Sequence, residues 1–152
     1  MPRIAILEDT KRRSTRLTRE QRERAIQVIT NALRRRGEII LAMVFGGVLI
    51  EGKPIRDIDV AIYTGYRVKP SEWPIYVDEL RTMLEKELYQ DLGLRKAVDV
   101  VLLEYAPPRL RATILKEGRV IINRSPGLRA LLLLHSLDDA KAMERTCKRL
   151  KQ

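Results

Sequence analysis

Three aspartates lie within apolar, strand-like segments of this chain, where carboxylates are uncommon. Asp57 and Asp59 stand two residues apart in the segment 57–63, and Asp99 interrupts the apolar run 97–103. A charge in such a segment costs free energy unless a cation or counter-charge compensates it. Carboxylate oxygens are the protein ligands that Mg²⁺ prefers, together with phosphate oxygens. These residues therefore predict a site for divalent metal and phosphate chemistry.

Strand geometry decides whether the carboxylates can meet. Successive side chains of a strand point to opposite faces, so Asp57 and Asp59 are expected to share one face. If the strand of Asp99 neighbours theirs, all three carboxylates meet on that face. The alternative is an exposed edge strand in which Asp57 and Asp59 pair with Lys53 or Arg56.

A glycine pair precedes these aspartates. Gly46 and Gly47 follow the apolar run 39–45 directly, and nine residues separate Gly47 from Asp57. Glycine lets the backbone turn sharply and approach a phosphate with its N–H groups. Such a pair also occurs as a simple turn, and its spacing to Asp57 favours the phosphate-binding interpretation.

The elements that must position these residues are read from hydrophobic periodicity and from turn residues. A basic N-terminal arm (1–17) precedes a single domain (18–152) that ends in a C-terminal helix. Helices are expected at 18–36, 71–92, 107–116 and 125–150, and strands at 39–45, 57–63, 98–103 and 118–122. This order predicts an α/β (α+β) fold, a mixed palm-like sheet with helices packed on it.

Helix boundaries and buried faces follow from particular residues. Thr18 and Gln21 form the pattern of a capping box at the start of the first helix. Its expected buried face is Ala25, Ile29, Ala32 and Leu33. The second helix should bury Ile75, Leu80, Leu84 and Leu88, with Trp73, Tyr76 and Tyr89 also packing.

The last helix is apolar around nearly its whole circumference. Leu128, Leu131, Leu132, His135 and Leu137 are expected to face inward. A helix of this kind is either buried centrally or forms an oligomer or partner interface. It is therefore a candidate for homo-oligomer formation.

Charge is distributed unevenly. The formal net charge is +10, with +7 on residues 1–36, −4 on residues 37–106 and +7 on residues 107–152. Basic ends around an acidic centre suit a metal site within a rim that attracts polyanions such as RNA, although a basic solvated surface has the same composition. Abundant Arg, Lys and Glu also fit a thermophilic source.

Several classes of protein are disfavoured by composition. Cys147 is the only cysteine and His135 the only histidine, which excludes an intrachain disulfide and a Cys/His metal cluster. A reducing, cytoplasmic location is expected. The sequence shows neither a signal peptide nor an apolar run long enough to span a membrane.

The glycine pair and the aspartates together resemble the signature of the nucleotidyltransferase superfamily, whose fold is that of DNA polymerase β. That signature is an apolar residue, Gly, then Gly or Ser, a gap of about nine to thirteen residues, and Asp-apolar-Asp-apolar. Here Phe45-Gly46-Gly47 precedes Asp57-Ile58-Asp59-Val60, and Asp99 matches the third carboxylate. The short chain is most similar to the minimal nucleotidyltransferase (MNT) type.

The resemblance implies chemistry for each matched position. Asp57 and Asp59 would bind two Mg²⁺ ions, and Asp99 would bind the catalytic ion and help to activate the acceptor hydroxyl. Gly46 and Gly47 would hold the triphosphate of ATP or another nucleoside triphosphate. Many small members resemble antitoxins paired with HEPN-domain ribonuclease toxins, and some adenylylate a tyrosine of that partner, so AMP transfer from ATP to a partner protein is the leading expectation.

Two features depart from the family pattern. Members often carry Ser as the second residue of the pair and a basic residue in the following turn, whereas this chain continues with Val48-Leu49-Ile50. Lys53 or Arg56 would then contact the triphosphate. Two other functions remain open: nucleotidyl transfer to RNA, and a non-catalytic module that neutralises a toxin or binds nucleic acid.

Overall fold

The computed structural model of the protein describes residues 10–151. Residues 1–9, the first part of the predicted basic arm, lie outside the described residues.

Four strands form one mixed sheet, as the sequence predicts. Their order in space is β3-β2-β1-β4. β1 pairs antiparallel with both β2 and β4, and β2 pairs parallel with β3. The strands are β1 (Leu41–Phe45), β2 (Asp57–Tyr63), β3 (Ala97–Leu102) and β4 (Arg119–Asn123).

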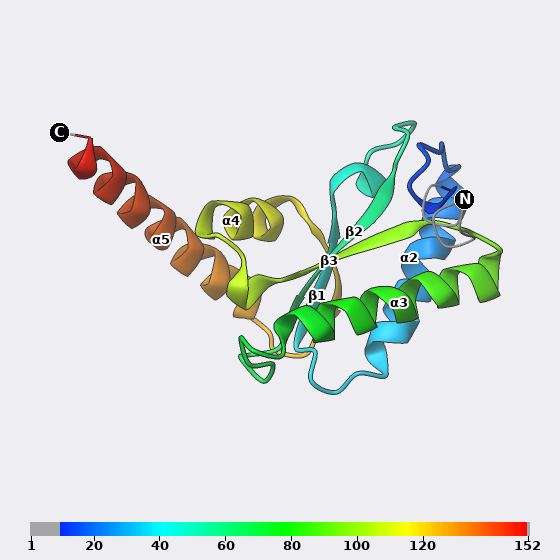
Figure 1. Ribbon diagram of the computed structural model, residues 1–152, viewed down its shortest axis with the longest axis horizontal. Coiled ribbons are helices and arrows are strands. Elements are labelled where there is room, and N and C mark those ends of the chain that lie inside the picture. Colours follow the sequence, from blue (N-terminus) through cyan, green and yellow to red (C-terminus); the bar gives the residue numbers. More distant parts are fainter. Residues whose placement is uncertain (1–9, 152) are drawn as a thin grey trace.

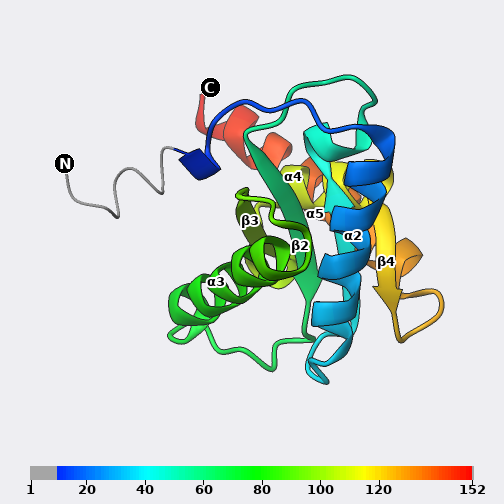
Figure 2. The ribbon, with the colours of Figure 1, turned by 90° about the vertical axis from the view of Figure 1, so that its right-hand side faces the viewer.

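Helices cover both faces of the sheet (Figures 1 and 2). α2 and α3 lie against one face, while α4 and the beginning of α5 lie against the other. The helices are α2 (Arg19–Arg34), α3 (Trp73–Leu92), α4 (Pro108–Glu117) and α5 (Leu128–Leu150), and two short 3₁₀ turns are η1 (Gly46–Leu49) and η2 (Leu103–Tyr105).

The apolar run of β1 is explained by its central position. Ala42 and Val44 face the core formed with α2 and α3, whereas Leu41 and Met43 face the core formed with α4. A strand buried on both faces needs apolar side chains at every position rather than at alternate positions.

α2 begins and packs as its sequence predicts. Thr18 Oγ1 accepts a hydrogen bond from the Gln21 N–H at 3.1 Å, and the Thr18 N–H donates to Gln21 Oε1 at 2.8 Å, which completes the capping box. The predicted inner face is fully buried: Ala25, Ile29, Ala32 and Leu33. This face packs α2 against the sheet and α3.

Four predicted core positions on the other helices are exposed. Ile75 is 66% exposed, because it lies in the first turn of α3, before the helix reaches the core at Leu80. His135 is exposed rather than a core histidine. Leu131 and Leu137 are also exposed, since α5 rests on α4 along one side and then extends away from the sheet (Figure 1).

The aromatic residues of α3 differ in what they contact. Trp73 stacks on Tyr105 with 5.4 Å between the ring centroids, and the Tyr76 hydroxyl donates to Glu38 Oε1 at 3.1 Å. Tyr89 does not pack in the core: it is 49% exposed, and the Arg95 guanidinium lies 4.7 Å from its ring centroid.

Residues 10–17 of the arm are attached to the domain at several points. Thr15 and Ile55 exchange two backbone hydrogen bonds, of 2.9 and 3.0 Å, and Leu17 is buried in the core. Lys96, only 1% exposed, donates from Nζ to the Arg13 carbonyl and, at 3.2 Å, to Thr15 Oγ1. The described part of the arm therefore lies along the β2–β3 side of the sheet.

Across residues 10–151, no helix combines the length and the apolar character that crossing a membrane requires.

Candidate metal and nucleotide site

The three aspartates meet at one end of the β2–β3 pair. The parallel register places Asp59 directly opposite Asp99, and Asp57 lies two residues before Asp59 on the same face. One oxygen from each carboxylate lies within 4.8 Å of the others, and all three residues are half-buried. The edge-strand alternative is therefore wrong for β2, which has a strand on each side.

The crossover connection through α3 brings Asp99 beside Asp57 and Asp59. Two parallel strands cannot be joined by a tight turn, so the chain passes through a helix before β3 begins. α3 packs its Leu80, Leu84 and Leu88 against the sheet and so sets the position of β3 beside β2. Within β3, Val98 and Leu102 face that core, which turns Asp99 to the opposite face, where Asp57 and Asp59 lie.

The carboxylates are close enough to change one another's proton affinity. Burial, followed by the negative charge of Asp57, raises the pKa of Asp59 from 3.8 to about 6. Hydrogen bonding to Asp57, burial and the Asp57 charge raise the pKa of Asp99 to about 6, and the Arg12 guanidinium opposes that rise. Clustered carboxylates with raised pKa values are a common property of functional sites.

The predicted glycine turn adjoins the trio. Gly46 has a φ of +76°, and a Cβ atom placed there would lie 2.5 Å from Asp59 Oδ2. Glycine is therefore required both by the backbone conformation and by the carboxylate beside it. At Gly47, an added Cβ would lie 3.8 Å from Lys53 Cδ. The aliphatic part of Lys53, which is predicted to contact the triphosphate, therefore runs past the turn. Arg56 is exposed immediately before β2.

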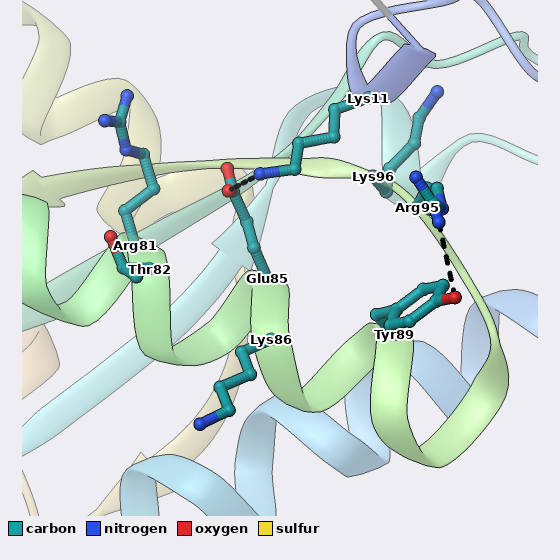
Figure 3. Close-up of a pocket in the computed structure, with 8 residues that line it drawn as sticks. All are labelled: Lys11, Arg81, Thr82, Glu85, Lys86, Tyr89, Arg95 and Lys96. Carbon is teal, nitrogen blue, oxygen red and sulfur yellow. Dashed lines mark hydrogen bonds and ion pairs between the residues drawn. The ribbon is translucent and has the colours of Figure 1, made fainter. Parts of the chain in front are cut away.

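Two cavities flank the outer side of β3. One, of about 510 Å³, is lined by Asp59 and Asp99 together with Phe45, Arg81 and Leu110 among others. The other, of about 370 Å³, lies between the arm and α3 (Figure 3). Arg81 lines both cavities, so they adjoin at this residue.

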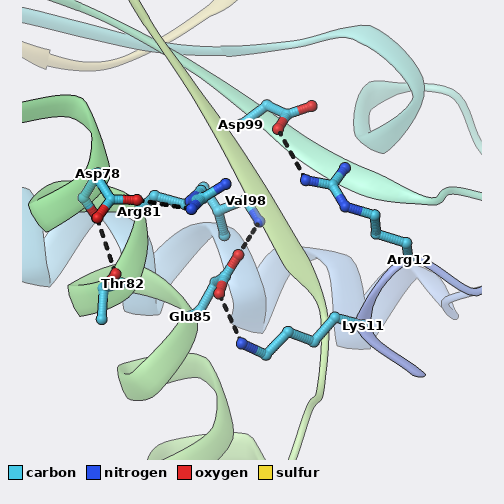
Figure 4. A network of polar contacts seen from close by, with 8 residues as sticks. All are labelled: Lys11, Arg12, Asp78, Arg81, Thr82, Glu85, Val98 and Asp99. Atoms are coloured by element: carbon cyan, nitrogen blue, oxygen red, sulfur yellow. Dashed lines mark hydrogen bonds and ion pairs between the residues drawn. The ribbon is translucent and has the colours of Figure 1, made fainter. Parts of the chain in front are cut away.

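The arm brings one cation, the guanidinium of Arg12, to the trio. Arg12 Nη1 lies 3.6 Å from Asp57 Oδ2, and its Nη2 lies 4.0 Å from Asp99 Oδ1. The adjacent Lys11 points to α3, where its Nζ bonds Glu85 Oε2 at 2.9 Å (Figure 4). Glu85 Oε1 also accepts the Val98 N–H at 3.1 Å and so links the arm, α3 and β3.

Arg12 and Arg81 were not singled out by sequence reasoning. The arm was recognised only as a net positive charge, and nothing in its sequence shows which cation reaches the aspartates. Arg81 is one charged residue among many on α3. A buried arginine was missed as well: Arg22 is 7% exposed and donates from Nη1 to the Val48 carbonyl at 3.4 Å, beneath η1.

The donor set suits a hard divalent cation. Three carboxylates with oxygens within 4.8 Å of one another repel each other unless a cation lies between them. The approach of the Arg12 guanidinium to two of the three is consistent with this, because it supplies part of that positive charge. Asp57, Asp59 and Asp99 are accordingly the residues that could hold Mg²⁺.

Comparisons with known proteins agree with this geometry. A family model described as "Polymerase beta, Nucleotidyltransferase" matches residues 27–127. No curated protein matches the chain. Solved structures share its fold, among them a chain of the toxin–antitoxin complex MntA–HepT, with 18% identity, a TM-score of 0.64, and coverage of 84% of this chain and 94% of that chain.

Two further structures are similar at the level of the fold. One is the complex of a tri-AMPylated HEPN toxin from Shewanella oneidensis with an MNT antitoxin, with 17% identity, a TM-score of 0.60, and coverage of 85% of this chain and 94% of that chain. The other is a toxin–antitoxin structure with AMP-PNP, with 18% identity, a TM-score of 0.58, and coverage of 82% and 94%. The family match covers the glycine turn and all three aspartates, and the chain therefore belongs to the polymerase β-type nucleotidyltransferase family, with the fold of the minimal nucleotidyltransferases.

Proposed function

We propose that this chain is a Mg²⁺-dependent nucleotidyltransferase that moves a nucleoside monophosphate, AMP from ATP, to a hydroxyl group of a partner protein. The observation that carries the proposal is the meeting of Asp57, Asp59 and Asp99 beside the Gly46 turn. An MNT-type antitoxin acting on a HEPN-type toxin is the corresponding biological role.

Each side of the site has a distinct task in this proposal. Gly46 and Gly47, with Lys53 and Arg56, would hold the triphosphate on the β1 side. Asp57 and Asp59 would hold two Mg²⁺ ions, and Asp99 would hold the ion nearer the acceptor. Bound Mg²⁺ would neutralise charge on the phosphates and favour the ionised hydroxyl.

The transfer itself is a single displacement. The acceptor oxygen would form a bond to the α-phosphorus, and the bond between that phosphorus and the bridging oxygen to the β-phosphate would break. Pyrophosphate would leave with the bridging oxygen. The hydroxyl proton would pass to a carboxylate oxygen of Asp99 or to water.

The choice of a protein acceptor is supported by the structural neighbours. One of the similar structures contains a tri-AMPylated HEPN toxin, and another contains the ATP analogue AMP-PNP. The exposed apolar residues of α5, including Leu131 and Leu134, offer a surface for such a partner or for a second copy of the chain.

Transfer to RNA is the second candidate function. It is favoured by the basic cavity between the arm and α3, which adjoins, at Arg81, the cavity lined by Asp59 and Asp99. In the non-catalytic alternative, the aspartates are unused and the chain neutralises a toxin by binding alone.

The deciding experiment is calorimetric binding of ATP, GTP, CTP and UTP with and without Mg²⁺, followed by transfer of label from the α-³²P nucleotide to a HEPN-type protein from the same genome. We expect Mg²⁺-dependent binding of ATP and labelling of the partner. The Asp57→Asn and Asp59→Asn variants should lose both activities.

Asp91→Asn, an exposed aspartate at the end of α3, is the matched control and should behave as wild type. Failure of the wild-type protein to bind any triphosphate would overturn the enzymatic proposal. Neutralisation of the partner by the Asp57→Asn variant without labelling would favour the binding module.

A further inference from the structure

The cavity between the arm and α3, here called the arm–α3 pocket, has a strongly positive wall (Figure 3). Its basic residues are Lys11, Arg81, Lys86, Arg95 and Lys96, against the single acid Glu85. Glu85 is already engaged, since one oxygen bonds Lys11 and the other accepts the Val98 N–H. Arg81 pairs with Asp78 at 2.7 Å, and the buried Lys96 donates to the Arg13 carbonyl. Lys86 and Arg95, both exposed, therefore supply most of the positive charge that a ligand could meet.

An aromatic ring stands within this basic wall. Tyr89 is 49% exposed and lines the pocket. Arg95 lies over the ring at 4.7 Å from its centroid and donates to the Tyr89 hydroxyl at 3.3 Å. Cations that bind phosphates and an aromatic face on which bases stack are the two components of sites for single-stranded nucleic acid.

The pocket is joined to the reaction site on one particular side. Gly46 touches Asp59 from β1, whereas Arg12 reaches Asp57 and Asp99 from the arm. The pocket is lined from the arm, α3 and the residues that precede the edge strand β3, whereas the glycine turn follows β1, on the other side of β2. If the turn holds the donor triphosphate, this side is left for the acceptor.

We propose that the arm–α3 pocket binds the phosphodiester backbone of a short single-stranded oligonucleotide, with a base stacked at Tyr89. The volume of about 370 Å³ falls within the range of ligand pockets, roughly 300–1,000 Å³. An acidic protein segment would satisfy the cations but would make no use of the aromatic ring. That the pocket lies on the side left for the acceptor rests on the proposed function, which places the donor triphosphate at Gly46 and Gly47. Binding of the oligonucleotide to the pocket does not depend on it.

The test is fluorescence anisotropy of a 5′-labelled hexanucleotide, oligo(A)₆ RNA, titrated with the full chain over a range of salt concentrations. We expect binding that weakens as salt is raised. Arg95→Glu should weaken it at least tenfold and lower the slope of log K against log[salt] by about one. Arg145→Glu, the same charge reversal on an exposed residue of α5, should leave affinity within about threefold of wild type.

The aromatic contribution is tested separately. Tyr89→Ala should weaken binding by about 5- to 150-fold, the range for stacking of a base on one aromatic side chain, while Tyr89→Phe should retain it. Tyr89 and Arg95 are both exposed, so their variants are expected to fold, and circular dichroism checks this. Equal losses for Arg95→Glu and Arg145→Glu would overturn the pocket as the site.

A hexaglutamate peptide tests the alternative that the pocket binds acidic protein segments. If it binds as tightly as the RNA and is equally sensitive to Arg95→Glu, the site takes acidic protein segments and the nucleotide proposal is wrong. Mg²⁺·ATP binding, measured on the same variants, separates this result from the proposed function. RNA binding that persists in Asp57→Asn, where ATP binding is lost, supports the pocket whether or not the chain is a transferase.

Discussion

At the scale of single residues, Gly46 combines two constraints that can be separated by mutation. Its positive φ disfavours any side chain by about 1–2 kcal/mol. A methyl group there would also meet Asp59 Oδ2 at 2.5 Å and displace that carboxylate. We expect Gly46→Ala to lower Mg²⁺ affinity at least tenfold, measured by calorimetry.

Gly52 provides the matched control for this substitution. It has nearly the same φ, +74°, and a Cβ atom there would meet nothing within 4 Å. Gly52→Ala should therefore cost similar free energy of unfolding and leave Mg²⁺ affinity unchanged. If both variants lost metal binding equally, backbone strain rather than contact with Asp59 would be the cause.

A second prediction at this scale concerns pH. Asp59 and Asp99 have pKa values of about 6 in the folded protein, above the ordinary 3.8, so the folded state binds protons more tightly than the unfolded state. The stability of the metal-free protein should therefore fall as pH rises from about 4 to about 6. Mg²⁺ requires the ionised carboxylates, so its binding should strengthen across pH 5–7.

Thermal melting with and without Mg²⁺ at pH 5.0 and pH 7.5 checks this prediction. The rise in Tm caused by Mg²⁺ should be larger at pH 7.5. The same rise in Tm at both pH values would mean that Mg²⁺ binding does not depend on the ionisation of Asp59 and Asp99.

The sequence identified the aspartates and the glycine pair, but not their full surroundings. Asp57 and Asp59 were recognisable because a strand alternates its side chains, and Asp99 because it breaks an apolar run. Arg12 was not recognisable, because its contact with Asp57 and Asp99 depends on how the arm crosses the sheet. Tertiary placement of a segment without periodicity leaves no pattern in the sequence.

At the scale of elements, the arm behaves as a part of the site. Thr15 pairs with Ile55, Lys96 holds the Arg13 carbonyl, and Arg12 approaches two of the three carboxylates. An exposed ion pair is worth up to about 1 kcal/mol. Under the proposed function, Mg²⁺ would have to displace Arg12, so we expect Arg12→Ala to tighten Mg²⁺ binding by up to about fivefold, measured by calorimetry without nucleotide.

Arg16→Ala is the control, since Arg16 is an exposed arginine of the same arm that forms no ion pair with the trio. It should leave Mg²⁺ affinity unchanged. Weaker Mg²⁺ binding by Arg12→Ala would instead indicate that the guanidinium helps to assemble the carboxylates.

Helices and strands were predicted well where periodicity and caps agree. The capping box at Thr18 and the buried face of α2 follow the sequence closely. The last helix was predicted in extent but not in burial, because its apolar residues surround it on all sides. Only packing against α4 decides that Ser136 is buried while His135 is exposed.

At the scale of the whole molecule, α5 extends beyond the sheet and carries exposed apolar residues (Figure 1). Leu131 is 53% and Leu134 62% exposed. Under the proposed function, a HEPN-type partner covers this surface. We expect the double substitution Leu131→Asp with Leu134→Asp to abolish the complex in size-exclusion chromatography with light scattering, while Mg²⁺·ATP binding persists.

Ile75→Asp, at an exposed apolar position of α3, is the control and should leave the complex intact. A complex that survives the double substitution on α5 would place the partner elsewhere. If the double substitution instead converts a dimer of the chain alone into a monomer, the surface serves self-association.

The parallel pairing of Asp59 with Asp99 also determines when the cluster can exist during synthesis of the chain. β1 and β2 are close in sequence and antiparallel, whereas β3 pairs only after the whole of α3 has crossed over. Closing the larger loop costs more chain entropy, and pairings distant in sequence form slowly. A nascent chain thus presents two aspartates on a hairpin before the ribosome has made the third. Under the proposed function, Mg²⁺ would bind after β3 has paired with β2, and it would act by slowing unfolding rather than by speeding folding.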